Sequence, residues 1–406
     1  MKNKFGKKIE LLAPAGDFSC LKTAFHFGAD AVYLGGKEYS LRAKCDNFSE
    51  EQIIEAVKYT HALGKKIYVT VNIFARNADI NEIKNYALFL EKAGVDAVII
   101  SDLGIFKIFK TLTNLEIHIS TQANVCNSYA AMQYVELGAK RIILARELPA
   151  AEISEICNDL CGKADIEVFI HGAMCISYSG RCLMSKYMTG RDANRGDCAY
   201  PCRYKYFLQE EKRQGEFFPI EEDDKGTYLM NSRDLCLINY LNELSDAGIT
   251  SFKIEGRMKN EYYTGGVVNI YKRAMNGEKF NYLEELEKLP HRPFTSGFTF
   301  SDQNTEFTKS SKIVLNYQIA AIVIEDSGRS DSVTVQIKVK NKINTGDELE
   351  IVSPNESNGK TFIYKGDTVN IPEQIVSIEC PYKLELYDIL RKEARHNSQT
   401  LEKTLE

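Results

Sequence analysis

The chain has 406 residues, a length that favours two domains over one. Hydrophobic residues make up 44% of it and charged residues 26%, as is typical of globular proteins, and the net charge of −5 does not by itself indicate nucleic-acid binding. No run approaches the roughly 18 apolar residues of a membrane span, and the N-terminal segment has no apolar core of signal-peptide length. We therefore expect a cytoplasmic protein that does not associate with membranes.

A repeated pattern up to about residue 260 predicts alternating helices and strands. Helix-like segments end in glycine, which readily takes the left-handed conformation past a helix end, and short β-branched runs follow. The predicted strands lie within residues 9–17, 30–36, 66–72, 96–102, 116–124, 141–148, 166–175 and 251–257. Eight such units predict a (β/α)8 TIM-like barrel. A doubly wound open sheet is the alternative, disfavoured because no glycine-rich dinucleotide fingerprint follows the first strand.

The seventh unit is longer than one helix requires, with about 75 residues between its strand and the eighth. It therefore predicts a long insertion after strand 7, at the C-terminal rim where barrels carry their active sites. Short strands separated by turn residues then predict a small C-terminal antiparallel β-barrel domain. The predicted organisation is a barrel over residues 1–310 with a Cys-rich insertion at 172–247, a β domain over 311–395 and a polar tail over 396–406.

Four cysteines lie close together in the insertion, with the spacing Cys-x6-Cys-x15-Cys-x3-Cys: Cys175, Cys182, Cys198 and Cys202. Clustered thiols in an intracellular chain indicate a metal or iron–sulfur site rather than disulfides. The spacing lacks the two close pairs of a zinc module, so we favour four-thiolate iron–sulfur ligation over structural zinc and over unligated thiols. Cys236 is a spare candidate for the fourth ligand, although its apolar, helix-like surroundings favour a buried thiol.

Polar residues at the predicted strand ends form a second set of candidates, because a barrel aims them at one cavity. The set comprises Asn72, Ser101, Asp102, Gln122, Asn124, Arg146, Glu147, His171, Glu255 and Arg257. Arg146 and Arg257 would clamp a carboxylate through bidentate hydrogen bonds, or would form structural ion pairs with the adjacent Glu147 and Glu255. His171 is either a catalytic group or a hydrogen-bonded structural residue. Hydrolase motifs such as HExxH and GxSxG are absent from the sequence.

The segment EVFIHGAMCISYSGRCLMS, from Glu167 to Ser185, resembles the signature of peptidase family U32. The opening ELLAPAGDFSCLKTAFHFGADAVYLGG and the later SFKIEGRMKNEYYTGGVVNIYKRA resemble the same family, over roughly residues 9–300 plus a β-rich C-terminal domain. Within the family, MNSRDL followed by KIEGRMK is most similar to the members that hydroxylate tRNA. The resemblance implies a tRNA-modifying enzyme that converts the wobble uridine to 5-hydroxyuridine, with an iron–sulfur cluster (4Fe-4S) and prephenate as co-substrate.

The resemblance also implies roles for particular residues. Cys175, Cys182 and Cys198 are the firmer cluster ligands, with Cys202 or Cys236 as the fourth. Arg146 or Arg257 would hold the small carboxylate co-substrate. If the substrate is tRNA, the basic residues of the insertion would contact its phosphates or would form an ordinary solvated surface: Lys186, Arg191, Arg195, Arg203 and Lys205. The nearby tyrosines would stack on an extruded base or would simply pack within the loop: Tyr178, Tyr187, Tyr200 and Tyr204. The family name implies the alternative of a collagenase-like peptidase, for which the residues supply no recognisable mechanism. The sequence leaves the oligomeric state open.

Overall fold

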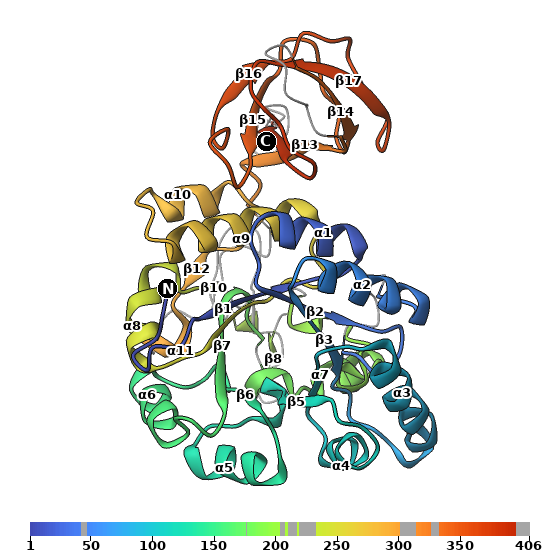
Figure 1. Ribbon diagram of the computed structural model, residues 1–406, viewed down its shortest axis with the longest axis vertical. Helices are drawn as coiled ribbons and strands as arrows, with labels where there is room; N and C mark the ends of the chain where they lie inside the picture. The colour runs from blue at the N-terminus through green and yellow to red at the C-terminus, as the bar shows by residue number, and fades with distance from the viewer. Residues whose placement is uncertain are drawn as a thin grey trace.

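Eight parallel strands close into a barrel in the computed structural model (Figure 1). The structure describes residues 1–41, 47–175, 177–203, 208–209, 217–218, 233–300, 314–325 and 333–394. The barrel strands are β1 (Glu10–Pro14), β2 (Ala31–Gly35), β3 (Lys66–Val71), β4 (Ala97–Ile100), β5 (Glu116–Ile119), β6 (Arg141–Ile143), β7 (Asp165–Ala173) and β11 (Ser251–Ile254). Pairing of β11 with both β1 and β7 closes the ring. The predicted (β/α)8 fold is therefore confirmed.

Helices follow the barrel strands and cover their outer faces. They are α1 (Phe18–His26), α2 (Glu50–Ala62), α3 (Ile80–Ala93), α4 (Leu103–Leu112), α5 (Ser128–Leu137), α6 (Ala150–Asp159), α8 (Leu241–Ala247) and α9 (Glu261–Met275). Local chemistry sets their ends. Asp102 caps α4 by accepting from Gly104 N and Ile105 N, and Gly138 ends α5 at a φ of 111°, which a side chain would strain. No helix in the described ranges is long and apolar enough to cross a membrane.

Two short strands extend the sheet beyond the barrel. β10 (Asp234–Cys236) pairs antiparallel with the end of β7, and β12 (Phe294–Thr295) pairs with β10. The helix-like setting expected for Cys236 is wrong at that residue, which lies on β10, while α8 begins only at Leu241. A free edge at the end of β7 gives this segment a hydrogen-bonding partner, and that partner outweighs its helical periodicity.

The C-terminal strands form a separate six-stranded antiparallel sheet with its own hydrophobic core. They are β13 (Tyr317–Val323), β14 (Val333–Val339), β15 (Glu348–Val352), β16 (Thr361–Ile363), β17 (Ile375–Cys380) and β18 (Ile389–Glu393). Their order, β16-β15-β18-β13-β14-β17, makes a half-barrel, which bears out the expected antiparallel domain. It packs beyond α9 and α10 (Tyr282–Glu287), where Arg391 donates to Glu285 at 2.7 Å and His26 contacts Asp388 at 2.8 Å (Figure 1). The predicted tail at 396–406 lies outside the described residues.

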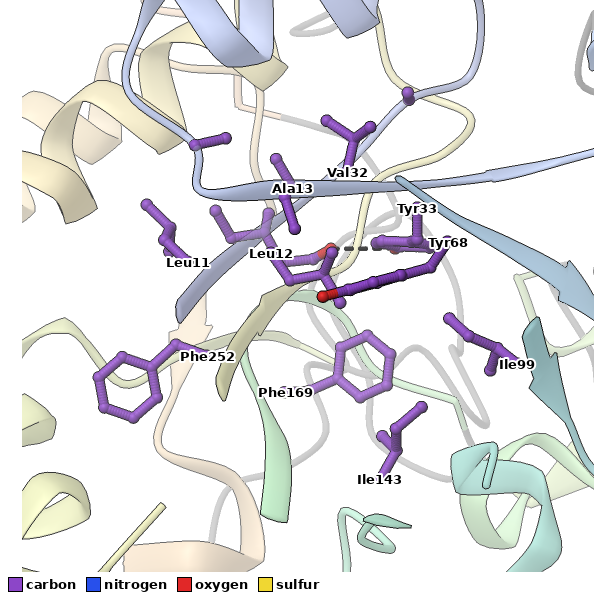
Figure 2. Close-up of a cluster of buried hydrophobic side chains, with 14 of the residues drawn as sticks. Leu11, Leu12, Ala13, Val32, Tyr33, Tyr68, Ile99, Ile143, Phe169 and Phe252 are labelled. Carbon is purple, nitrogen blue, oxygen red and sulfur yellow. Dashed lines mark hydrogen bonds between the residues drawn. The ribbon is translucent and has the colours of Figure 1, made fainter. Parts of the chain in front are cut away.

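Inside the barrel, apolar side chains meet above a buried ionic network. Figure 2 shows Tyr33, Ile99, Ile143 and Phe169 converging on the interior. Below them Glu167, which is fully buried, accepts from Lys253 at 2.8 Å and from Arg141 at 3.0 Å, and Arg141 also pairs with Glu10. Glu167, Arg141 and Lys253, which are buried, and Glu10, which is partly exposed, thus neutralise one another.

Burial alone would raise the pKa of Glu167, but the charges of Lys253 and Arg141 outweigh it and lower that pKa from 4.5 to about 2. Because the folded-state pKa is depressed, this stabilisation is present above about pH 4.5 and is lost as the pH falls towards 2.

We predict that Glu167→Gln lowers the free energy of unfolding at pH 7 by about 3–5 kcal/mol, because it leaves buried cations without their counter-charge. Lys7→Gln, which removes a solvent-exposed pair with Asp165, should cost less than about 1 kcal/mol. Urea unfolding at pH 7 and at pH 3.5 measures both variants, and the deficit of Glu167→Gln should shrink at the lower pH. A cost below about 1 kcal/mol at pH 7 would contradict the proposed role of the network.

Candidate functional site

A cavity of ≈ 170 Å³ opens at the C-terminal ends of the barrel strands. Its apolar part consists of Tyr33, Ile99, Ile143 and Phe169, the side chains that Figure 2 shows converging inside the barrel. Its upper wall is formed by the segment after β7, which returns across the rim as η3 (Tyr178–Gly180), α7 (Met184–Thr189), η4 (Ala193–Arg195) and η5 (Pro201–Arg203). The cavity therefore combines a fixed apolar floor with a wall supplied by the predicted insertion.

Cys175, Cys182, Cys198 and Cys202 all line this cavity as half-buried thiols that form no disulfide. Cys175 follows β7 directly, whereas the other three come from the returning segment. In the ranges that the structure describes, no three His, Cys, Asp or Glu side chains are arranged to hold a single metal ion. Four soft sulfur donors spread around one cavity instead match the needs of a larger, multi-atom group.

Hydrogen bonds fix the backbone that carries these cysteines. Asn194 brackets Cys182, accepting from its N–H at 3.2 Å and donating to its carbonyl at 2.9 Å. The Ser185 hydroxyl donates to Arg191 O and accepts from Ala199 N, which ties α7 to the segment before Cys202. These contacts hold the thiols in place through neutral groups.

A backbone N–H also points at one of the sulfurs. Tyr200 N donates to Cys198 Sγ at 3.3 Å, with Tyr200 held in the left-handed region at a φ of 57°. Hydrogen bonds of this kind stabilise ligating thiolates and tune the potential of the group they hold. The donor set and this contact therefore fit an iron–sulfur cluster.

Cys236 lies elsewhere, away from the residues that line the cavity. It is 7% exposed, and its Sγ is 3.9 Å from Tyr271 Oη on the outer side of β7. Burial raises the pKa of this thiol to about 11, so that it stays protonated at neutral pH.

Arg146 and Arg257 reach the same cavity from opposite sides of the barrel. Arg146 lies over the Phe169 ring at 5.2 Å, donates to Ala173 O and forms no ion pair with any described carboxylate. Arg257 is 4% exposed and donates to Ser40, Thr70 and Asn47. Neither guanidinium pairs with its sequence neighbour in the contacts above.

The guanidinium of Arg257 fills space that glycine leaves open. A Cβ added to Gly35 would come within 2.2 Å of Arg257 Nη2. Glycine at the end of β2 is therefore required for this cation to lie in the wall.

The three other predicted catalytic residues separate in space. Glu255 lines the cavity. Glu147 lies behind the wall, where its carboxylate accepts from both the N–H and the hydroxyl of Ser179 at 2.5 Å. Because Ser179 has a φ of 44°, these two bonds hold η3 in an otherwise strained conformation.

His171 faces away from the cavity because β7 contains a bulge. Lys253 pairs with Phe169 but the next residue, Ile254, pairs with His171, so Ile170 is the extra residue and the side chains beyond it change faces. The imidazole packs against Tyr271, whose hydroxyl is 3.3 Å from Nδ1. Burial lowers the pKa of His171 to about 3, so it stays neutral at physiological pH.

Sequence reasoning missed Lys253, which lines the cavity above its contact with Glu167. The alternation of SFKIEG places this lysine on the inner face of the strand, which is the signal that would have found it.

Three predicted phosphate-binding cations are already paired. Lys186 contacts Asp192, Arg191 contacts Asp197, and Arg195 contacts Asp79, at 3.1, 2.6 and 2.8 Å. Residues 204 and 205 and the Arg203 side chain lie outside the description. Of the tyrosines, Tyr187 is 93% and Tyr178 53% exposed, whereas the Tyr200 hydroxyl contacts Met258.

Comparison with known proteins identifies the family. The model of Peptidase family U32 matches residues 16–309, and that of the Peptidase family U32 C-terminal domain matches residues 315–391. The chain is 37% identical to the tRNA hydroxylation protein P1 of Bacillus subtilis over 95% of both chains, and 37% identical to the tRNA hydroxylation protein P of Escherichia coli over 86% of both. It is 43% identical to an uncharacterized protease of Methanocaldococcus jannaschii, over 73% of this chain and 74% of that one. The chain belongs to peptidase family U32, as the resemblance indicated.

We predict that Glu147→Gln raises the hydrogen-exchange rate of the Ser179–Cys182 amides about 10- to 100-fold, because it removes charge-assisted bonds from η3. Exchange measured by mass spectrometry on a peptide spanning this segment tests it. Glu152→Gln, on the exposed face of α6, is the matched control and should leave exchange unchanged. Equal exchange in wild type and Glu147→Gln would show that Glu147 does not hold the cysteine segment.

Proposed function

We propose that this chain is an RNA-modifying enzyme that hydroxylates the wobble uridine of tRNA at C5, giving 5-hydroxyuridine. The observation that carries the proposal is the placement of four cysteines and two arginines around one barrel cavity. The identity with relatives named tRNA hydroxylation protein, over nearly the whole chain, supports RNA as the substrate. Extrusion of the base from its loop would bring it to this cavity, as in other enzymes that modify bases.

Cys175, Cys182, Cys198 and Cys202 are the residues that would hold an iron–sulfur cluster, for which we propose the 4Fe-4S type. When bound, such a cluster supplies one-electron redox chemistry beside the base. Tyr200 N–H and the bracket from Asn194 keep the thiols in place before the group binds. Cys236 is an unsuitable fourth ligand in this arrangement, because it is buried and protonated behind β7.

The cavity charges suit a small carboxylate co-substrate, for which prephenate is the candidate. Arg146 and Arg257 both line the cavity; Arg146 donates to Ala173 O, and Arg257 donates to Ser40, Thr70 and Asn47, which fix its guanidinium. Both guanidiniums are therefore placed to bind a carboxylate that enters the cavity.

Replacement of C5–H by C5–OH is a two-electron oxidation of the base, for which the proposed donor would supply the oxygen: the donor's bond to that oxygen breaks and its electron pair stays with the donor, which is reduced, while the C5–O bond forms and the C5 hydrogen leaves as a proton. Glu255 is the carboxylate among the described lining residues, and we assign it the uptake of that proton. Glu147 and His171 do not reach the cavity, so we assign them positioning roles.

A collagenase-like peptidase is the second candidate, supported by the family name and by the relative named as a protease. Its weakness lies in the site itself. No histidine is among the described residues that line the cavity, and His171 is turned away and neutral. The arrangement therefore lacks the paired nucleophile and base of the known serine or cysteine peptidase sites.

Mass spectrometry of tRNA nucleosides tests the two functions together. In a deletion strain with no second copy of the family, wobble 5-hydroxyuridine should disappear and should return with the wild-type gene. Gelatin incubated with the pure protein should remain intact. Unchanged 5-hydroxyuridine in the deletion strain would refute the hydroxylase, and gelatin cleavage lost in a Cys182→Ala variant would favour the peptidase.

The cluster is tested by anaerobic purification with visible absorption and iron analysis. We predict about four iron atoms per chain in the wild type, and loss of colour and iron in Ala variants of Cys175, Cys182, Cys198 and Cys202. Cys236→Ala should retain both, as should Cys161→Ala, which removes an exposed thiol far from the cavity. A colourless wild-type protein that contains zinc would refute the cluster, and loss of iron in Cys236→Ala would return that residue to the ligand set.

A further inference from the structure

One buried amide oxygen in the cavity wall has no hydrogen-bond partner among the residues that the structure describes. Gln122 follows β5 on η2 (Thr121–Ala123), lines the cavity and is only 8% exposed. Its Oε1 has no hydrogen-bond partner among the described residues. Native proteins satisfy nearly all buried polar atoms, so an orphaned acceptor on a side chain that lines a cavity calls for a ligand that completes it.

The neighbouring polar side chains of the same wall already form hydrogen bonds within the protein. Ser120 Oγ accepts from Gln122 N, Thr121 Oγ1 donates to Leu144 O, and Asn72 Oδ1 accepts from Leu41 N. Thr70 is shared by Leu34 O and Arg257. Among the described residues that line the cavity, Gln122 is therefore the neutral one with a buried side-chain oxygen that lacks a partner.

The surrounding structure holds Gln122 in place without using its amide. Its carbonyl accepts from Arg181 Nε at 2.7 Å, and its backbone N–H is bound by Ser120. A Cβ added to Gly180 would lie 3.4 Å from Gln122 Nε2, an ordinary van der Waals distance, so the cysteine segment packs directly beside this amide. A fixed backbone with an open amide is a preorganised recognition group.

We propose that Gln122 recognises the target base by binding the N3–H and C4=O edge of uracil; this inference rests on the proposed function. A glutamine amide offers one acceptor and one donor side by side, which matches the N3–H donor and O4 acceptor of uracil. The apolar floor of Ile99, Ile143 and Phe169 faces the cavity beside it and supplies the flat contact that a pyrimidine needs. The base would thus be read by one side chain while its faces rest on apolar groups.

Two substitutions separate recognition from structure. Gln122→Met keeps the length of the side chain and removes both hydrogen-bonding atoms. Gln122→Glu keeps the shape but presents two acceptors, one of which opposes O4 of uracil. Gln133→Met is the matched control, since Gln133 lies on the exposed face of α5 and bonds only Glu136 among the described contacts.

The rate at which wobble uridine becomes hydroxylated after induction of each gene in the deletion strain is the measurement. We expect a 10- to 100-fold fall for Gln122→Met, corresponding to the loss of about two hydrogen bonds, and a larger fall for Gln122→Glu. Gln133→Met should match the wild type. The purified Gln122 variants should keep the iron content, visible spectrum and melting temperature of the wild type.

Three results would decide against the proposal. A wild-type rate in Gln122→Met would overturn it while leaving the hydroxylase function intact. A reduced rate accompanied by loss of iron or colour would assign Gln122 to the support of the cysteine segment instead. Wobble 5-hydroxyuridine that persists in the deletion strain would refute the hydroxylase itself, and the inference with it.

Discussion

The buried pairing of Glu167 with Arg141 and Lys253 is the constraint on which the site depends. Glu167 lies on β7 and Lys253 on β11, the two strands whose pairing closes the barrel, and Arg141 extends the network through β6 to Glu10 on β1. Buried charges tolerate little displacement, because each stays stable only with its partner in place. The pairing of β7 with β11, which closes the barrel, is therefore fixed. Because β7 leads directly into the cysteine segment, this pairing also sets the position of Cys175.

A second constraint is the bulge in β7, which places the residues before it and beyond it on opposite faces of the strand. Before the bulge, Glu167 and Phe169 face inward, and beyond it His171 turns to the outer side, where it meets Tyr271 and the antiparallel β10. Cys236 on β10 pairs with His171 on β7, and both residues are buried on this outer side. The single extra residue thus turns His171 out of the cavity to the side where Cys236 lies, and the charged and thiol groups left in the cavity are the four cysteines, Arg146, Arg257, Lys253 and Glu255.

The sequence predicted the parts of this structure that depend on local periodicity. Glycines such as Gly138 marked helix ends, β-branched runs marked strands, and cysteine spacing marked the segment that lines the cavity. It did not predict features that depend on pairing in space. Strict alternation along β7 cannot reveal the bulge that turns His171 outward. A count of basic residues cannot reveal that Arg195 is neutralised by Asp79, which is more than 100 residues away in the chain. The same limit applies to Glu147, whose role depends on the strained backbone of Ser179.

These constraints together explain why charged, apolar and neutral polar groups lie on different walls of the cavity. The ionic network below the cavity is neutral overall, so it adds little net field to the cavity. Among the other charged residues that line the cavity, the two arginines, Arg146 and Arg257, outnumber the one carboxylate, Glu255. Ser40, Thr70 and Asn47 accept hydrogen bonds from Arg257 and hold its guanidinium in one orientation. A cation held in this way does not have to reorganise when an anion binds. The apolar floor beside it lowers the local dielectric constant and so strengthens its attraction for the anion. The proposed thiolate-ligated cluster and carboxylate co-substrate would both draw on that positive charge, whereas a neutral base would not. The amide of Gln122, which is itself neutral, is the kind of group that such a base would require.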